Sequence, residues 1–159
     1  MVRKVAVALA LGAFIAAPAA FAQNVAGTYK MVSNVNIAPD GKKTDTFGPN
    51  ATGMMVLTGD GHFVIANSRA DVPKFASNSR MNGTADENKA AVQGSIALYG
   101  TYTADKDNIT LKVEGSSYPN WKGTEQKRKY TVAGDKLTWT VAAASSSGSS
   151  EVTWQKVKK

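Results

Sequence analysis

Short runs in which apolar and polar residues alternate recur along most of this chain. Such period-two alternation is typical of β-strands that bury one face. Turn residues separate the runs, as in Gly59-Asp60-Gly61, where Asp-Gly tolerates the positive φ that a tight hairpin needs. The alternation predicts strands in eight places: 27–35, 53–58, 62–66, 98–104, 108–115, 123–132, 137–142 and 151–157.

One alanine-rich segment departs from this pattern. Thr84 is a good helix cap, and Glu87 three residues later completes a capping box. We therefore expect one helix, residues 85–97, between the third and fourth strands. Its small residues would face the sheet: Ala90, Ala91, Gly94 and Ala97.

The hairpin connections indicate how the strands are arranged. Eight short strands joined mostly by hairpins favour an all-β fold, an up-and-down antiparallel barrel, over a sandwich of the same strands, which stays open as the alternative. An eight-stranded barrel is just wide enough to hold one small ligand.

The first residues of the chain follow the pattern of a signal peptide. A basic region, 1–4, precedes the apolar run 5–17, and Ala20-Phe21-Ala22 has the spacing of a signal-peptidase site. We expect residues 1–22 to be a signal peptide and residues 23–159 to form one domain, periplasmic or secreted, with no integral membrane span after processing. The chain has no cysteine, so packing without disulfides must hold the domain together.

Charge and residue types exclude several classes of function. The formal charge of +7 becomes +7 − 2 = +5 without Arg3 and Lys4, and the basic residues are scattered, which does not suggest nucleic-acid binding. His62 is the only histidine, so a zinc or copper site lacks its usual ligands. No glycine-rich phosphate loop opens a helix. We predict no metal, no cofactor and no catalytic residue.

The stretch from Glu114 to Tyr130 carries the most informative chemistry. In the strand 123–132 one face would hold Glu125, Lys127, Lys129 and Thr131, and the other Gln126, Arg128, Tyr130 and Val132. The second face must be the interior, because burying three charges is the costlier choice. Arg128 therefore points into the barrel.

Two explanations for an inward Arg128 stay open. It forms a structural ion pair with Glu114 on the neighbouring strand, or it awaits a ligand that carries an anionic or carbonyl oxygen. The phase of the strand 108–115 decides between them in part. If Ile109, Leu111 and Val113 take the interior, Glu114 faces outward unless a bulge near Gly115 changes the phase.

An ordered series of motifs extends over nearly all of residues 23–159. It comprises Gly27-Thr28-Tyr29-Lys30, Gly59-Asp60-Gly61-His62, Pro73-Lys74-Phe75-Ala76-Ser77, Tyr99-Gly100-Thr101-Tyr102, Val113-Glu114-Gly115-Ser116-Ser117, Pro119-Asn120-Trp121, Gly123-Thr124-Glu125-Gln126 and Arg128. The series resembles the bacterial and fungal lipocalin-like domain family, which implies a calycin-type barrel with a helix after its third strand.

The chain departs from this family at two places. Tyr29 stands where the family commonly has tryptophan, and we expect it to plug one barrel end under Lys156. Leu111-Lys112 stand where members often carry a histidine pair, so a reaction that needs those histidines would be lost. The resemblance implies the fold and no single activity.

These observations support three hypotheses. The first is a non-enzymatic carrier or sensor of a small apolar or amphipathic molecule bound in the barrel. The second is an isomerase or cyclase that uses Glu114 or Tyr130 as acid–base group and Arg128 to steady an oxyanion. The third is an envelope protein with a solid barrel whose basic face binds a partner.

The candidate ligand-binding residues combine the inward polar positions with aromatic side chains at the barrel rim. Trp121 and Tyr118 would form the lip of an entrance, and Phe75 would lie on a lid formed by the loop before the helix. The full set is Arg128, Glu114, Gln126, Tyr130, Tyr102, Trp139, Trp121, Tyr118 and Phe75.

Overall fold

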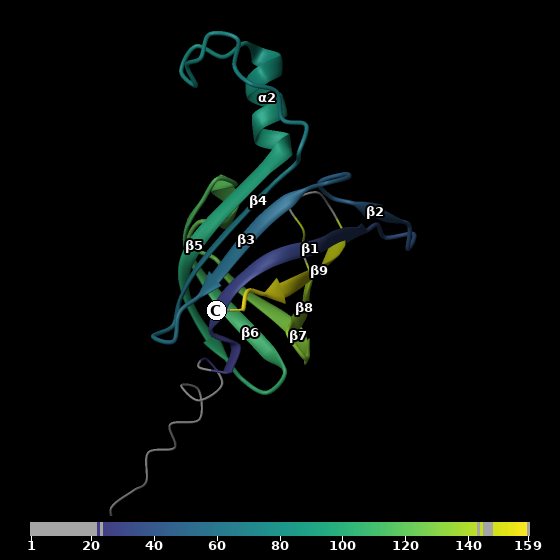
Figure 1. Ribbon diagram of the computed structural model, residues 1–159, viewed down its shortest axis with the longest axis vertical. Coiled ribbons are helices and arrows are strands. Elements are labelled where there is room, and N and C mark those ends of the chain that lie inside the picture. Colours follow the sequence, from purple (N-terminus) through teal and green to yellow (C-terminus); the bar gives the residue numbers. More distant parts are fainter. Residues whose placement is uncertain (1–21, 23, 143, 145–147, 159) are drawn as a thin grey trace, which may run out of the picture.

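A computed structural model describes residues 22, 24–142, 144 and 148–158 (Figure 1). Nine strands, one α-helix and one short 3-10 helix account for most of them. In chain order they are β1 Gly27–Ile37, β2 Lys43–Asp45, β3 Thr52–Leu57, β4 His62–Ser68, α2 Ala85–Gly94, β5 Ser95–Ala104, β6 Asn108–Ser116, η1 Pro119–Trp121, β7 Glu125–Ala133, β8 Lys136–Val141 and β9 Ser149–Lys156.

The strands close into the predicted antiparallel barrel. From β3 to β9 each strand pairs with the next one along the chain, and β1 pairs with both β3 and β9. The eight-stranded up-and-down barrel with its helix between the third and fourth barrel strands is confirmed. The ninth strand, β2, was not predicted: its three exposed residues, Lys43–Asp45, pair only with the end of β1.

Alternation sets the two faces of the barrel wall. In β6 the side chains of Ile109, Leu111 and Val113 are buried, whereas Lys112 and Glu114 are exposed. The sequence left open which residues of this strand point inward, and the structure shows that they are the aliphatic ones. The aliphatic side chains point inward because burying their apolar area stabilises the fold, whereas the Glu114 carboxylate is more stable in contact with water.

A β-bulge does occur beside Glu114, but it leaves this residue on the outside. Val113 pairs with Gly100 and Gly115 pairs with Tyr99, so Glu114 is the extra residue of β6. Gly100 permits this close approach, because a Cβ at that position would overlap the Lys112 carbonyl oxygen.

The helix α2 begins as predicted and ends earlier. Thr84 Oγ1 accepts a hydrogen bond from the Glu87 amide and Glu87 caps Thr84 in return, which confirms the capping box. The helix ends at Gly94, and β5 begins at Ser95, so the predicted helical range 85–97 is too long.

The predicted packing of this helix on the sheet is wrong. Figure 1 shows α2 projecting from one end of the barrel, beyond β4 and β5. Most of the helix is exposed, and Gly94, its only buried residue, lies against Val72 of the preceding loop. Ala97 already belongs to β5.

The opposite end of the barrel is plugged by Tyr29. This side chain is buried, its hydroxyl donates to the Val25 carbonyl oxygen at 2.7 Å, and Lys156 Nζ lies 5.7 Å from its ring centroid. The expectation that Tyr29 fills this end under Lys156 is confirmed. Residues 1–21 of the expected signal peptide lie outside the described residues, so that expectation stays a prediction.

In the described part of the chain, α2 and η1 are both too short and too polar to cross a lipid bilayer.

Candidate functional site

The barrel interior holds a small cavity whose largely apolar lining includes several polar groups. Its volume is about 50 Å³, and Asn67 and Ile96 place it in the half of the barrel from which α2 projects. The side chains that matter for its chemistry are Asn67, Trp121, Arg128, Trp139, Ser150 and Trp154. The interior below it is filled, with Met55, Leu57 and Phe63 each almost completely buried.

Arg128 is the charged group of this cavity. It is 4% exposed and points into the barrel, as the alternation in β7 predicts. Its Nη2 donates to Gln126 Oε1 at 2.8 Å, and its Cζ lies 4.6 Å from the ring centroid of Trp139. Burial lowers the pKa of Arg128 to about 9, so the guanidinium is charged at neutral pH.

A chain of hydrogen bonds holds Gln126 in place. Gln126 Nε2 donates to Thr124 Oγ1 at 3.3 Å, and that hydroxyl donates to the Trp121 carbonyl oxygen at 2.7 Å. The directions of these bonds leave Gln126 Oε1 as the acceptor for Arg128. The chain therefore links the buried guanidinium to η1, which carries Trp121 at the edge of the cavity.

Four buried polar atoms of the described residues lack a hydrogen-bond partner. They are Asn67 Oδ1, Arg128 Nε, Trp139 Nε1 and Trp154 Nε1. All four residues line the same 50 Å³ cavity. Buried polar groups are normally paired, so four residues with an unpaired polar atom around one hollow make this cavity the candidate binding site.

The two tryptophans and Asn67 are held by packing from neighbouring strands. The rings of Trp139 on β8 and Trp154 on β9 meet edge to face, with centroids 5.8 Å apart. Asn67 lies opposite Gly53 in the β3–β4 pair. A Cβ on Gly53 would overlap Asn67 Oδ1, so glycine leaves room for the amide.

The predicted partner of Arg128 is wrong. Glu114 lies on the outer face of β6 and is exposed, because the inward positions of that strand belong to aliphatic residues. In the described part of the chain the hydrogen bond of Arg128 goes to Gln126 on its own strand. The predicted contact with a tyrosine hydroxyl is also not made.

Tyr102 and Tyr130 use their hydroxyls elsewhere. The Tyr102 hydroxyl lies 2.8 Å from the Thr58 carbonyl oxygen and 3.0 Å from that of Ala22, at the end of the barrel that Tyr29 plugs. The Tyr130 hydroxyl donates to the Asp105 carbonyl oxygen at 3.0 Å. Neither tyrosine lines the cavity.

The rim residues fall into two groups. Trp121 lines the cavity, and Tyr118 packs edge-on against it with ring centroids 5.6 Å apart. Phe75 lies in the excursion before α2, where its ring covers Gly83. The cavity lining does not include Phe75, so its predicted place on a lid over the site is not supported.

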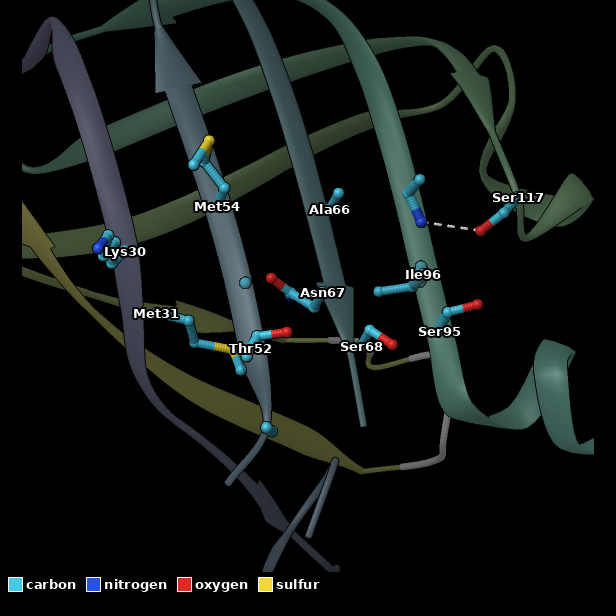
Figure 2. A pocket seen from close by; sticks show the side chains of 13 residues that line it. Lys30, Met31, Thr52, Met54, Ala66, Asn67, Ser68, Ser95, Ile96 and Ser117 are labelled. Atoms are coloured by element: carbon cyan, nitrogen blue, oxygen red, sulfur yellow. Dashed lines mark hydrogen bonds between the residues drawn. The ribbon is translucent and has the colours of Figure 1, made fainter. Parts of the chain in front are cut away.

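Three larger hollows lie near the cavity. One, of about 280 Å³, shares Asn34 and Phe47 with it. A second, of about 330 Å³, is lined by residues of β7 and the end of β8, and shares Trp121, Arg128 and Val141 with the cavity. The third, of about 630 Å³, lies on the outer face of β1, β3, β4 and β5 (Figure 2), and its lining also includes Asn67 and Ile96 of the cavity. A row of exposed cross-strand neighbours crosses this outer groove: Lys30, Met54, Ala66 and Ala97.

Comparison with known proteins identifies the family. The family model described as a lipocalin-like domain matches residues 26–157. The chain belongs to the lipocalin-like domain family. It is also 35% identical, over 77 residues, to the 4'-hydroxy-3'-methoxypropiophenone carrier protein ppsC of Aspergillus oryzae, an alignment that covers 43% of this chain and 69% of that protein.

Comparison with solved structures finds a similarity to a crystal structure of a variant of the fluorescent protein UnaG. Its TM-score to this chain is 0.41 and its sequence identity is 11%, with 86% of this chain and 99% of that chain covered.

Three residues of the site in this lipocalin-like domain were missing from the sequence prediction: Asn67, Ser150 and Trp154. Asn67 continues the inward series of Phe63 and Ile65, but the predicted strand ended at Ala66, two residues before β4 ends. Trp154 alternates with Val152 in the last strand, and this pattern alone would have placed it inside. What the sequence does not reveal is that all three share one cavity with Arg128.

Proposed function

We propose that this protein is a carrier that binds one small aromatic or amphipathic molecule inside its barrel. The observation that carries the proposal is that four residues with an unpartnered buried polar atom all line one cavity. An unsatisfied buried group costs about 1–3 kcal/mol. A ligand that supplies the missing hydrogen-bond partners recovers part of that cost on binding. A core without a binding role gains nothing from leaving these groups unpaired.

The similarity to a fungal carrier supports this choice of ligand. That relative is named for a hydroxy-methoxy aryl ketone. Such a molecule has an aromatic ring, oxygen atoms that accept hydrogen bonds and one hydroxyl that donates. The three donors and one acceptor of the cavity complement this mixture.

Ligand entry requires side chains at the edge of the cavity to move. A volume of about 50 Å³ holds a few water molecules, whereas small-molecule sites usually span about 300–1,000 Å³. Phe47 and Trp121 each line both the cavity and a neighbouring surface hollow, of about 280 and 330 Å³ respectively. We expect one or both to swing aside when the ligand binds.

Tryptophan emission offers a direct test, because all three tryptophans of the chain line the cavity. Titration with 4'-hydroxy-3'-methoxypropiophenone should change the emission in a saturable way, and calorimetry should give the same affinity. Asn67→Leu should weaken binding several-fold to about tenfold by removing the acceptor.

A matched variant separates the interior from the outer groove. Ala97→Phe fills the groove on the outer face and should leave the affinity unchanged. If Ala97→Phe abolished binding while Asn67→Leu did not, the ligand would lie in the groove and the interior site would be wrong. If no small molecule of this class bound, a solid barrel that binds a macromolecular partner would be the better hypothesis.

The enzymatic hypothesis loses its acid–base group. Glu114 lies on the outer surface and the Tyr130 hydroxyl is bound to the Asp105 carbonyl oxygen, so neither reaches a ligand beside Arg128. The signal-peptide pattern of residues 1–22 supports a carrier that works in the periplasm or outside the cell.

A further inference from the structure

We infer that the ligand carries an anionic oxygen, which binds Arg128 from the gap between β7 and β8. This inference rests on the proposed carrier function and narrows it to a chemical class. The shared chemistry is an oxyanion, a carboxylate or a phenolate, on an aromatic body.

The charge of the site is the first argument. Among the described residues no carboxylate lines the cavity, and the one that accepts from Arg128 is the neutral Gln126. A buried cation without a counter-ion is costly, and the cost falls when an anion of matching geometry is taken up. A neutral ligand of the same shape leaves the charge uncompensated.

The hydrogen-bonding groups are the second argument. Donors outnumber acceptors among the orphaned atoms of the cavity: Arg128 Nε, Trp139 Nε1 and Trp154 Nε1 against Asn67 Oδ1. An ionised carboxylate accepts several hydrogen bonds and donates none, and hydrogen bonds between charged groups are the strong ones. The cavity is large enough for such a head group and too small for a ring as well.

The gap between β7 and β8 can hold the aromatic ring of the ligand. The first half of β7 pairs with β6, from Glu125 to Lys129, and only Tyr130 to Ala133 pair with β8. Beside the part of β7 that does not pair with β8 lies the hollow of about 330 Å³, which reaches Arg128. Trp121, Val141 and Ala142 form its apolar lining, and one carboxylate, Glu125, and one further cation, Lys127, also line it. A ring in this hollow would place its oxyanion in the cavity.

Pairs of probes that share a ring but differ in whether they carry an oxyanion test the chemical class. Calorimetry would compare 4-hydroxybenzoate with 4-hydroxybenzamide for the carboxylate arm, and 4-nitrophenolate with nitrobenzene for the phenolate arm. We expect at least one anion to bind about tenfold to a hundredfold more tightly than its neutral partner.

Variants assign that preference to Arg128. Arg128→Met should abolish the preference, and Arg128→Lys, which keeps the charge without the planar fork, should retain part of it. Lys129→Gln is the matched control, because it removes the same charge from the outer face one residue along and should leave the preference unchanged. Circular dichroism of each variant would check that the barrel is still folded.

The outcomes separate the inference from the proposed function. Equal binding of anion and neutral partner, a preference that survives Arg128→Met, or the absence of anion binding would overturn the oxyanion class, whereas binding of the propiophenone would still support the carrier. For the route, Ala142→Phe should weaken anion binding at least tenfold and Ala97→Phe should not. Unchanged affinity in Ala142→Phe would overturn the gap as the binding place.

Discussion

Replacing Arg128 by methionine should change the free energy of unfolding by no more than about 1.5 kcal/mol in either direction. Burial lowers its pKa to about 9, which corresponds to a burial cost of roughly 5 kcal/mol. The hydrogen bond to Gln126 returns about 1.5–3 kcal/mol and the contact with the Trp139 face about 2 kcal/mol. The charged side chain is therefore close to balance in the unliganded barrel.

Urea unfolding followed by far-ultraviolet circular dichroism measures this difference without relying on the tryptophans. Ile109→Ala is the reference for an ordinary core truncation, since Ile109 is fully buried and lies opposite Arg128 in the β6–β7 pair. It should cost about 2–5 kcal/mol. If Arg128→Met instead cost the 3–5 kcal/mol typical of a broken buried ion pair, the guanidinium would have a carboxylate partner and the reasoning would be refuted.

The pH dependence of the same pair of proteins gives an independent check. Burial lowers the pKa of Arg128 in the folded state to about 9, below its value in the unfolded chain, so the unfolded chain binds more protons above about pH 9. Stability from this group should therefore rise with pH above about 9, as the burial cost is relieved. Above about pH 9 the free energy of unfolding of wild type should rise relative to that of Arg128→Met. If the difference between the two proteins stayed constant with pH, burial would not have lowered the pKa of Arg128.

Four further outcomes are expected. Gly53→Ala should displace the Asn67 amide and weaken ligand binding more than it lowers the urea midpoint, which calorimetry and unfolding compare. Thr84→Ala removes the helix cap and should cost α2 about 1 kcal/mol, seen as faster amide exchange in the helix alone. Burial raises the pKa of Tyr102 to about 12, so above pH 10 the folded state keeps a proton that the unfolded chain releases. The free energy of unfolding of wild type should therefore fall as the pH rises from about 10 to about 12. The fall should be smaller in Tyr102→Phe. Intact-mass analysis of the exported protein should show a start at Gln23, and retention of Met1 would contradict the signal peptide.

The sequence reveals the barrel because alternation is a local signal. Lys127 and Lys129 on one face and Arg128 between them admit only one burial choice, and the structure confirms it. The same rule fails at Val132, which is 56% exposed although it shares the face of Arg128. Alternation gives the direction of a side chain and says nothing of where along the strand the core ends.

The partners of the site depend on contacts that no local pattern contains. Glu114 and Arg128 are on adjacent strands, but the phase of β6 was ambiguous in sequence, and the aliphatic residues decided it. The actual partner, Gln126, is two residues away on the same strand. Which inward residues meet in one cavity follows from the register and shear of the whole barrel, as Asn67 and Trp154 illustrate.

The excursion between β4 and β5 leaves and re-enters the wall at adjacent positions. Ser68 and Ser95 are paired residues, so the chain returns beside its point of departure after residues 69–94. A tight hairpin turn could replace the whole excursion without opening the sheet, since a shorter loop loses less entropy on closure. The same junction would accept a foreign peptide or a reporter domain. The junction of Ser68 and Ser95 is thus a point at which the barrel can be fused to another protein.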